Sequence, residues 1–436
     1  MLPILKQVLR PPQTRQIMRI AVVGCSHGGL DTIYKAIHRV DAETKKSGEL
    51  PVELLLCCGD FQAIRNNADI YTMKAPTKYR LLRDFHNYYA GRKKAPMLTL
   101  VVGGNHEANS HMRECFHGAW LAPNIYFLGY AGCVLVDGWL RVAGSSGIYK
   151  AEDYKKGHFE RLPYIPSTLV STYHTRLYGV ERLMNLQTQG PKVDVFMSHD
   201  WPRAIEHHGD TAALLREKPR FEHEVDSNTL GSPPLETLLK ALKPARWCSG
   251  HMHVRFTAEY KHGKKSAPDS ETTKFLALSR PGVNREFLEV IDVPTPAAYQ
   301  TPPSARQHAP TLFFDPHWLA IVRAYTPFLP LAPRAIPLPA AAEAEQLIAD
   351  SLAWVRQHVS DDQKGVQGLK AVSDVQVFKR TAPPTRSPEG KEDTNVTLKM
   401  YNNPQTQAFC DMLGIPNQLH YDYDASGQAR TSVDRT

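Results

Sequence analysis

Strand-like segments along the first part of the chain repeatedly end in polar residues that can bind a metal ion, usually beside a glycine. Five apolar runs, each typical of a buried strand, are followed by Cys25-Ser26-His27, Gly59-Asp60, Gly104-Asn105-His106-Glu107, Ser198-His199-Asp200 and Gly250-His251-Met252-His253. Helical stretches between the strands predict an α/β sandwich. Because the carboxyl ends of strands meet at one edge in such proteins, we expect these side chains to lie close together.

The residue types in these blocks suit a site for two divalent cations. Two ions held about 3.5–4 Å apart can bind both the attacking and the leaving oxygen of a phosphoryl group. Asp60 is the carboxylate among the blocks that could bridge them, and the imidazoles favour zinc, iron or manganese over magnesium or calcium. A single histidine is more often an ordinary surface or core residue than a metal ligand. The repetition of these blocks after successive strands is not expected by chance and indicates a shared site.

The blocks resemble, in order and composition, the signature of the calcineurin-like metallophosphoesterases over about residues 18–260. That resemblance implies an α/β fold of the calcineurin-like metallophosphoesterase type, a β-sandwich flanked by helices, with a smaller C-terminal domain. It assigns His27, Asp60 and His253 to one ion, with Cys25 beside it. It assigns Asp60, Asn105, His199 and His251 to the other ion. His106 is then expected to face the substrate and protonate the leaving oxygen, oriented by a nearby carboxylate.

Cys25 stands where the general superfamily has aspartate, and in this it resembles the RNA lariat debranching enzymes. Other segments resemble the same family: 24–28, 57–63, 103–108, 120–126, 198–202, 228–233 and Asn403-Pro404-Gln405-Thr406. The family resemblance implies hydrolysis of the 2′–5′ phosphodiester at the branch of an excised intron lariat, by a metal-activated water and without a covalent enzyme intermediate. It implies two divalent ions as cofactors, Mn²⁺ or Fe²⁺ with Zn²⁺, and a thiolate at Cys25 favours zinc and iron over manganese.

Branched RNA must also be recognised, and one segment has a suitable composition. Residues 148–180 interleave aromatic and basic side chains, which can stack on splayed bases and neutralise phosphates. By composition alone such a stretch is more often a solvated surface loop. The family resemblance implies that it is the lariat-recognition loop. The candidate RNA contacts are Tyr149, Tyr154, Phe159, Tyr173 and Arg176.

The chain divides into three predicted parts. Residues 1–17 form a basic N-terminal extension, in which Pro11 and Pro12 argue against a helical targeting segment. Residues 18–293 form the metallophosphoesterase catalytic domain, and residues 294–436 form a C-terminal debranching-enzyme domain. Within the last part we expect helices over 340–358 and 403–413, and a flexible polar stretch over 380–393.

Composition bounds the partners and the compartment. The net charge of +8 suits a polyanionic partner such as RNA, although charge alone is weak support. Seven cysteines, an odd number, and no signal-peptide core predict a reducing compartment. Nuclear residence is inferred from the substrate, and a monomer is the default expectation. No run is apolar enough to cross a membrane.

Two other functions are compatible with the superfamily blocks. The first is a metallophosphoesterase that acts on phosphoproteins, nucleotides or cyclic phosphodiesters, against which Cys25 and the debranching-enzyme blocks argue. The second is a non-catalytic scaffold with the same fold. The presence of Asn105, His106, His251 and His253 argues against a scaffold.

Overall fold

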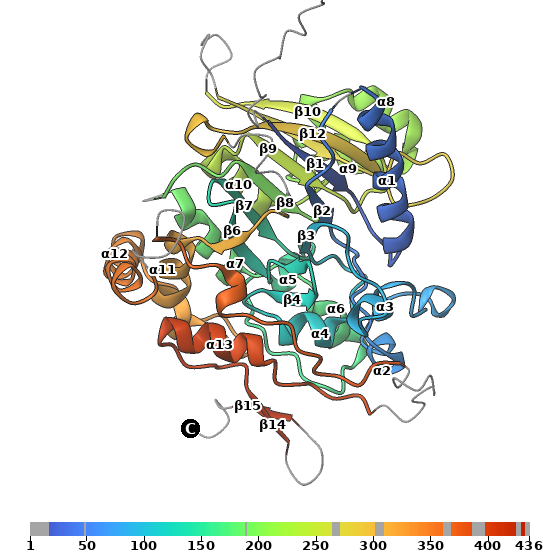
Figure 1. Cartoon of the computed structure of the whole chain (residues 1–436). Coiled ribbons are helices and arrows are strands. Elements are labelled where there is room, and N and C mark those ends of the chain that lie inside the picture. Colours follow the sequence, from blue (N-terminus) through green and yellow to red (C-terminus); the bar gives the residue numbers. More distant parts are fainter. Residues whose placement is uncertain are drawn as a thin grey trace, which may run out of the picture.

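Two β-sheets packed face to face form the centre of the molecule (Figure 1). The computed structural model describes residues 17–431 except 48, 188–189, 264–270, 301–308, 361–367, 386–396 and 424–428. The predicted N-terminal extension therefore lies outside the described residues, apart from Ile17. One sheet has the order β12 (Leu288–Pro294), β1 (Ile17–Val23), β2 (Leu54–Cys58), β3 (Leu98–Val102), β5 (Ile125–Phe127), β4 (Ala119–Ala122). The other has the order β10 (Phe256–Lys261), β11 (Thr272–Ala277), β9 (Arg246–Ser249), β8 (Val195–Ser198), β7 (Leu140–Ser145), β6 (Ala131–Val136), β13 (Leu312–Phe314).

The central strands are apolar on both faces, because both faces are covered. In the first sheet β1, β2 and β3 run parallel. Alternate residues of β1, such as Ile20 and Val22, belong to the core between the two sheets. Their neighbours Ala21 and Val23 face the other way and pack with residues of helix α1 (Leu30–Ser47). Burial on both faces explains why these strands read as continuous hydrophobic runs.

Helices cover the outer face of each sheet, which confirms the predicted α/β sandwich. The first sheet is covered by α1, α3 (Phe85–Tyr89) and α4 (Asn109–Glu114). The second is covered by α7 (Leu177–Met184), α10 (Pro233–Leu242) and α11 (Pro316–Tyr325), and α12 (Ala341–His358) packs against α11. Shorter helices are α2 (Asn67–Ile70), α5 (Ala151–Tyr154), α6 (Pro166–Ser171), α8 (Thr211–Glu217) and α9 (Glu222–Asp226). Among the described residues, no helix combines the length and apolarity that a bilayer crossing needs.

The C-terminal part of the chain is built into the sandwich. Strand β13 pairs antiparallel with β6, so the second sheet gains an edge strand from it. Strand β12, at the end of the predicted catalytic domain, pairs antiparallel with β1 and forms the edge of the first sheet. The predicted helices over 340–358 and 403–413 are α12 and α13 (Pro404–Leu413). Figure 1 places α13 at the bottom of the molecule, above the short hairpin of β14 (Tyr421–Tyr423) and β15 (Ala429–Thr431).

The Asn-Pro-Gln-Thr motif attaches α13 to the edge of the first sheet. The Asn403 side chain caps the helix by accepting from the Gln405 backbone N–H at 2.9 Å. The Gln405 side chain accepts from the Trp120 N–H and donates to the Trp120 carbonyl, each at 2.9 Å. The Thr406 hydroxyl donates to the Glu114 carbonyl at 2.8 Å. Gln405 thus pairs the free backbone edge of β4 as another strand would.

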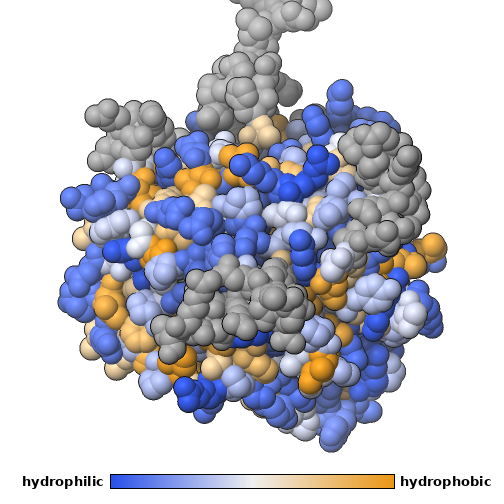
Figure 2. Space-filling view, turned by 90° about the horizontal axis from the view of Figure 1, so that it is seen from below, coloured by the Kyte–Doolittle hydropathy of each residue, from blue (hydrophilic) through white to orange (hydrophobic). Residues whose placement is uncertain are grey.

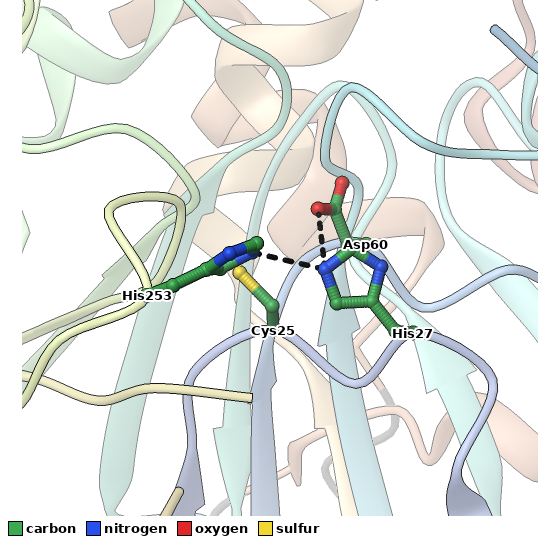
Figure 3. A group of neighbouring side chains, drawn as sticks. All are labelled: Cys25, His27, Asp60 and His253. Carbon is green, nitrogen blue, oxygen red and sulfur yellow. Dashed lines mark hydrogen bonds and ion pairs between the residues drawn. The ribbon is translucent and has the colours of Figure 1, made fainter. Parts of the chain in front are cut away.

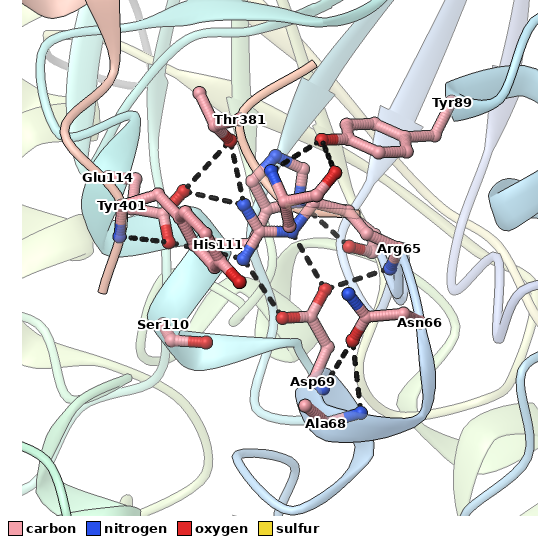
Figure 4. A network of polar contacts seen from close by, with 12 residues as sticks. Arg65, Asn66, Ala68, Asp69, Tyr89, Ser110, His111, Glu114, Thr381 and Tyr401 are labelled. Carbon is pink, nitrogen blue, oxygen red and sulfur yellow. Dashed lines mark hydrogen bonds and ion pairs between the residues drawn. The ribbon is translucent and has the colours of Figure 1, made fainter. Parts of the chain in front are cut away.

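A buried polar network joins a second C-terminal segment to the loop after β2 (Figure 4). The Arg65 guanidinium is fully buried and donates to Asp69, Glu114 and the Thr381 hydroxyl. The Tyr401 backbone N–H also donates to Glu114, at 3.0 Å. Residues 381–385 are held in place by these and neighbouring contacts, so the predicted flexibility over 380–393 is wrong for this part. The remainder of that stretch, from 386 on, lies outside the described residues.

Replacing Gln405 tests whether the motif holds the C-terminal helix on the sheet. Gln405→Ala leaves the half-buried Trp120 amide and carbonyl without their side-chain partner, which should lower the free energy of unfolding by about 1–3 kcal/mol. Gln407→Ala, on the exposed side of the same helix, should change it by less than about 0.5 kcal/mol. Urea unfolding followed by circular dichroism measures both, and equal effects of the two variants would contradict the assigned role.

Candidate metal centre

The predicted ligands come from both sheets and meet at one end of the sandwich. His27 follows β1, Asp60 follows β2 and Asn105 follows β3 in the first sheet. In the second sheet His199 directly follows β8, and His251 and His253 follow β9. These strands are parallel within each sheet, so their carboxyl ends lie at the same edge. The expected convergence of the strand ends is therefore present.

One group of donor atoms surrounds a single point. Cys25, His27, Asp60 and His253 each offer one atom, and these atoms all lie within 4.8 Å of one another (Figure 3). The His27 Nε2 atom lies 3.0 Å from the His253 Nε2 and 3.4 Å from the Asp60 Oδ2. A nitrogen, oxygen and sulfur set of this kind suits a borderline or soft divalent cation.

A second group of donors lies on the other side of Asp60. The Asp60 Oδ1 atom is 3.3 Å from the His199 Nε2, which in turn is 3.0 Å from the Asn105 Oδ1. The His251 ring packs beside the His199 ring, with 4.9 Å between their centroids. The two carboxylate oxygens of Asp60 therefore face different groups, which is the arrangement a bridging ligand requires.

The ligand loops adopt strained backbone conformations. Positive φ angles occur at His27 (44°), Asp60 (46°), His251 (64°) and His253 (53°), in a region that non-glycine residues rarely occupy. Such strain, about 1–3 kcal/mol per residue, is typical of functional sites and is held by the surrounding structure. Gly59 is required for a different reason, because a Cβ atom there would lie 2.2 Å from the His199 Nδ1.

The electrostatics leave the imidazoles neutral and the carboxylate charged. Burial lowers the pKa of His199 to about 4 and that of His253 to about 3, so both rings keep a lone pair at neutral pH. Burial alone would raise the pKa of Asp60, but His199, His27 and His106 hold it below its usual range. The His199 Nδ1 lies 2.8 Å from the Cys58 carbonyl, which fixes the tautomer and turns Nε2 toward Asp60.

Cys25 is placed to bind an ion but is not ionised by its protein surroundings. Burial, and then Asp60, raise the pKa of its thiol well above the ordinary value. Its sulfur accepts the His251 backbone N–H at 3.0 Å. A thiol of this kind loses its proton when a cation binds to it. The position of Cys25 is therefore compatible with a divalent metal ion, whose charge would stabilise the thiolate.

His106 lies beside the ligands without belonging to either group. Its backbone N–H donates to the Asp60 Oδ1 at 2.8 Å. Its ring Nδ1 donates to the Lys74 carbonyl at 2.6 Å, which leaves Nε2 toward the cavity that His106 lines with His27 and His253. The prediction that a carboxylate orients His106 is wrong. The ring is oriented by the backbone carbonyl of Lys74, in the loop after α2.

Glu107 is a structural member of the site that the sequence reasoning did not single out. Its carboxylate accepts from the backbone N–H groups of Phe61, Gln62 and Gly104, at 2.7 to 2.9 Å. Burial and the nearby Asp60 raise its pKa to about 8 in spite of these bonds. Glu107 thereby joins the loop that carries Asp60 to the loop that carries Asn105. Its place directly after Asn105-His106 was the available signal.

Comparisons with known proteins show the family to which the chain belongs. The family model of calcineurin-like phosphoesterases matches residues 18–255, and that of the lariat debranching enzyme C-terminal domain matches residues 270–418. The human lariat debranching enzyme is 42% identical over 404 residues, covering 91% of this chain and 69% of its own. The chain belongs to the lariat debranching enzyme family. The Arabidopsis thaliana relative is 39% identical, covering 92% of this chain and 87% of its own, and that of Drosophila melanogaster is 37% identical, with 92% and 78%.

The segment that debranching enzymes are expected to use for recognition is partly helical here. It contains α5, α6 and the first residues of α7. Tyr149 is half-buried beside the site, where its N–H donates to Asp200, and its ring contacts that of Tyr154 at 5.6 Å. Tyr173 is half-buried, and burial together with Asp60 raises its pKa to about 12. Phe159 is also half-buried.

Arg176 is a correction to the predicted RNA contacts. Its side chain is 2% exposed. The guanidinium donates to the Glu160 carboxylate at 2.5 Å, to the Ser171 carbonyl at 2.9 Å and to the Asp153 carbonyl at 2.8 Å. All of these partners are internal, so Arg176 holds the recognition segment together and does not present its charge to a ligand.

The buried neutral His199 predicts a pH dependence of stability in the metal-free protein. Its folded pKa of about 4 lies below the ordinary 6.5, so between these values only the unfolded chain takes up the proton. Stability should therefore fall as the pH falls from 6.5 to about 4, by up to about 1.4 kcal/mol per pH unit from this residue. Urea unfolding after chelation should show a shallower slope for His199→Asn, but not for the exposed His38→Asn. An unchanged slope for His199→Asn would contradict this assignment.

Asp60 should determine how many ions the chain holds. After loading with Mn²⁺ and removal of the excess, about two ions per chain are expected, and fewer than one for Asp60→Asn, because the amide has no negative charge and only one oxygen to replace the two carboxylate oxygens that face the two groups. Inductively coupled plasma mass spectrometry gives the ratio, with the exposed Asp374→Asn as the control. One full ion retained by Asp60→Asn would show that the carboxylate serves only one position.

Proposed function

We propose that this chain hydrolyses the 2′–5′ phosphodiester bond at the branch point of excised intron lariats. The observation that carries the proposal is the Asp60 carboxylate lying between two groups of metal donors, with His106 beside it. Relatives named lariat debranching enzymes, which this chain matches over most of its length, support the substrate. The donor groups support the reaction class, a metal-dependent phosphodiester hydrolysis.

The two donor groups would hold two divalent cations. Cys25, His27, Asp60 and His253 would bind one, and Asp60, Asn105, His199 and His251 the other. When bound, the ions supply positive charge to activate a water and to stabilise the charge that develops on the phosphoryl oxygens. We propose Fe²⁺ with Zn²⁺, or Mn²⁺, for these positions. Cys25 favours the first pair, because thiolates bind zinc and iron more tightly than manganese.

His106 would act as the general acid. The Lys74 carbonyl accepts the Nδ1–H, so the proton that reaches the substrate must come from Nε2 on the cavity side. Water adds its oxygen to phosphorus and releases one proton to the solvent, the bond from phosphorus to the 2′-oxygen breaks, and His106 gives its Nε2 proton to that 2′-oxygen. The 5′-phosphate remains on the first nucleotide of the intron. No serine, threonine or cysteine is needed as a nucleophile in this scheme.

The aromatic residues of the recognition segment would contact the RNA near the branch. Tyr149 and Tyr173 lie beside the metal centre and are half-exposed, as stacking on an unpaired base requires. Tyr154 supports Tyr149 through their ring contact. Phe159 belongs to the same segment and is the fourth candidate.

We further propose that the protein acts as a monomer in the nucleus. Excised introns arise where pre-mRNA is spliced, which supports the nuclear location. On the face seen in Figure 2, the described hydrophobic residues are scattered among hydrophilic ones and form no single large area, which supports the monomer.

A paired cleavage assay tests the proposed reaction. A synthetic branched RNA and its linear 3′–5′ isomer are incubated with the protein, with Mn²⁺ or with Fe²⁺ and Zn²⁺, and selective cleavage of the 2′–5′ bond is expected. His106→Ala should lower kcat by about 10²- to 10⁴-fold while the metal content stays the same. The exposed His38→Ala is the matched control and should retain activity.

The alternatives give different results in the same assay. Hydrolysis of an aryl phosphodiester with an intact branch would indicate another calcineurin-like phosphodiesterase. No hydrolysis of either compound, with no metal retained, would indicate a scaffold.

A further inference from the structure

A cavity of about 200 Å³ opens directly beside the metal centre. His27, His106 and His253 form one wall of it. The remaining wall consists of Gln62, Ala75, Pro76, Tyr79, Arg83 and Arg280. Among the described residues, none from the recognition segment 148–180 lines it. The cavity is therefore a place for substrate distinct from the one that Tyr149 and Tyr173 offer.

Arg280 follows a residue that is hydrogen-bonded to the segments carrying Cys25 and His253, and it makes no ion pair with a described residue. The preceding Ser279 accepts the Cys25 backbone N–H at 3.2 Å, and its hydroxyl donates to the His253 carbonyl at 3.1 Å. The Arg280 Nε atom is buried and has no hydrogen-bond partner. No acidic side chain of the described part of the chain pairs with its guanidinium. A buried, unpaired guanidinium atom at the wall of a cavity indicates an anionic ligand.

Arg83, from the segment just before α3, also lines the cavity and could also bind an anion. Its backbone has a φ of 55°, so its position is held against conformational strain. Gly28, next to the ligand His27, makes room for it, because a Cβ atom at Gly28 would lie 2.5 Å from the Arg83 Cβ. The following Asp84 N–H donates to the Gly28 carbonyl at 3.2 Å. In the described structure no carboxylate neutralises Arg83.

The positive charge continues beyond the cavity. Lys218 is surrounded by other cations, and burial together with Arg220, Arg285 and Arg280 lowers its pKa although the neighbouring Glu217 opposes this. Arg285 and Arg220 are exposed. Neighbouring cations repel one another, and a bound polyanion would relieve that repulsion.

Tyr79 provides the aromatic surface of the cavity. Its side chain is 47% exposed, and the Lys78 ammonium lies 5.0 Å from the centre of its ring. Pro76 and Ala75 form apolar wall next to it. An exposed ring beside two unpaired guanidinium groups is the combination that binds one nucleotide of a single strand, the base by stacking and the phosphate by charge.

We propose that this cavity binds a nucleotide of the RNA strand that flanks the scissile phosphate, with its phosphate on Arg83 and Arg280 and its base on Tyr79. The inference rests on the proposed debranching function. Since the recognition segment lies outside this cavity, two strands that meet at the branch would be held at separate places, and the 2′–5′ bond would lie between them at Asp60 and His106.

The test compares arginine variants on branched RNA. Arg280→Met and Arg83→Met keep the apolar stem but remove the charge, and each should raise KM by about 10-fold or more, with the loss falling mainly on KM. The slope of log(kcat/KM) against log salt should become shallower by about 0.7 per variant, as expected for one lost phosphate contact. A merely structural role would not change that slope. Arg39→Met, on the exposed face of α1, is the control and should leave KM and slope as they are.

The stacking contact is tested by a pair of variants at one position. Tyr79→Ala should raise KM about 10-fold, whereas Tyr79→Phe keeps the ring face and should restore binding to within about 2-fold. Equal losses in the two variants would contradict stacking.

The result on wild-type protein separates the two proposals. If wild type cuts the branch and the arginine variants match it in KM and salt slope, the cavity does not bind the strand, and the debranching function stands. If wild type cuts only an aryl phosphodiester, the debranching function has failed. The cavity proposal is then overturned with it, because no branched substrate remains to be bound.

Discussion

The Asp60 carboxylate is the group on which the rest of this structure depends. One of its oxygens lies 3.4 Å from the His27 Nε2, the other lies 3.3 Å from the His199 Nε2, and the His106 backbone N–H donates to it as well. His27 comes from the first sheet and His199 from the second, so this contact requires the two sheets to pack with their strand ends at the same edge. The buried core between the sheets, together with the strands added at their edges, supplies that packing.

The site is costly to assemble without cations. Four ligand residues have positive φ angles, several imidazoles are buried in the neutral state, and a buried thiol lies close to a carboxylate. These features oppose folding, and the hydrophobic sandwich must offset them. Bound divalent cations would make the electrostatic free energy of the site favourable, because their positive charge attracts both the thiolate and the carboxylate. The strain is thereby part of what makes the donor groups ready for metal ions.

The convergence of the candidate ligands could be predicted from the sequence because its signals are local: an apolar run, a glycine and a polar residue. Contacts between distant residues could not. The Lys74 carbonyl that orients His106 is a backbone atom 32 residues away and has no sequence signature. Arg176 lies in a segment whose composition predicts RNA contacts. Its structural role is evident only from its contact with the buried Glu160 in the folded chain. The Asn-Pro-Gln-Thr motif was recognisable, but its pairing with Trp120 spans 285 residues. The same limit concealed Arg83 and Arg280, which come together only in the folded chain.

The most direct test of the account is anomalous diffraction from crystals grown with the metal ions. The account predicts two anomalous peaks about 3.5–4 Å apart, one near Cys25, His27 and His253 and the other near Asn105, His199 and His251, with Asp60 in contact with both. A single peak, or two peaks of which only one contacts Asp60, would contradict the claim that this carboxylate bridges a two-metal centre.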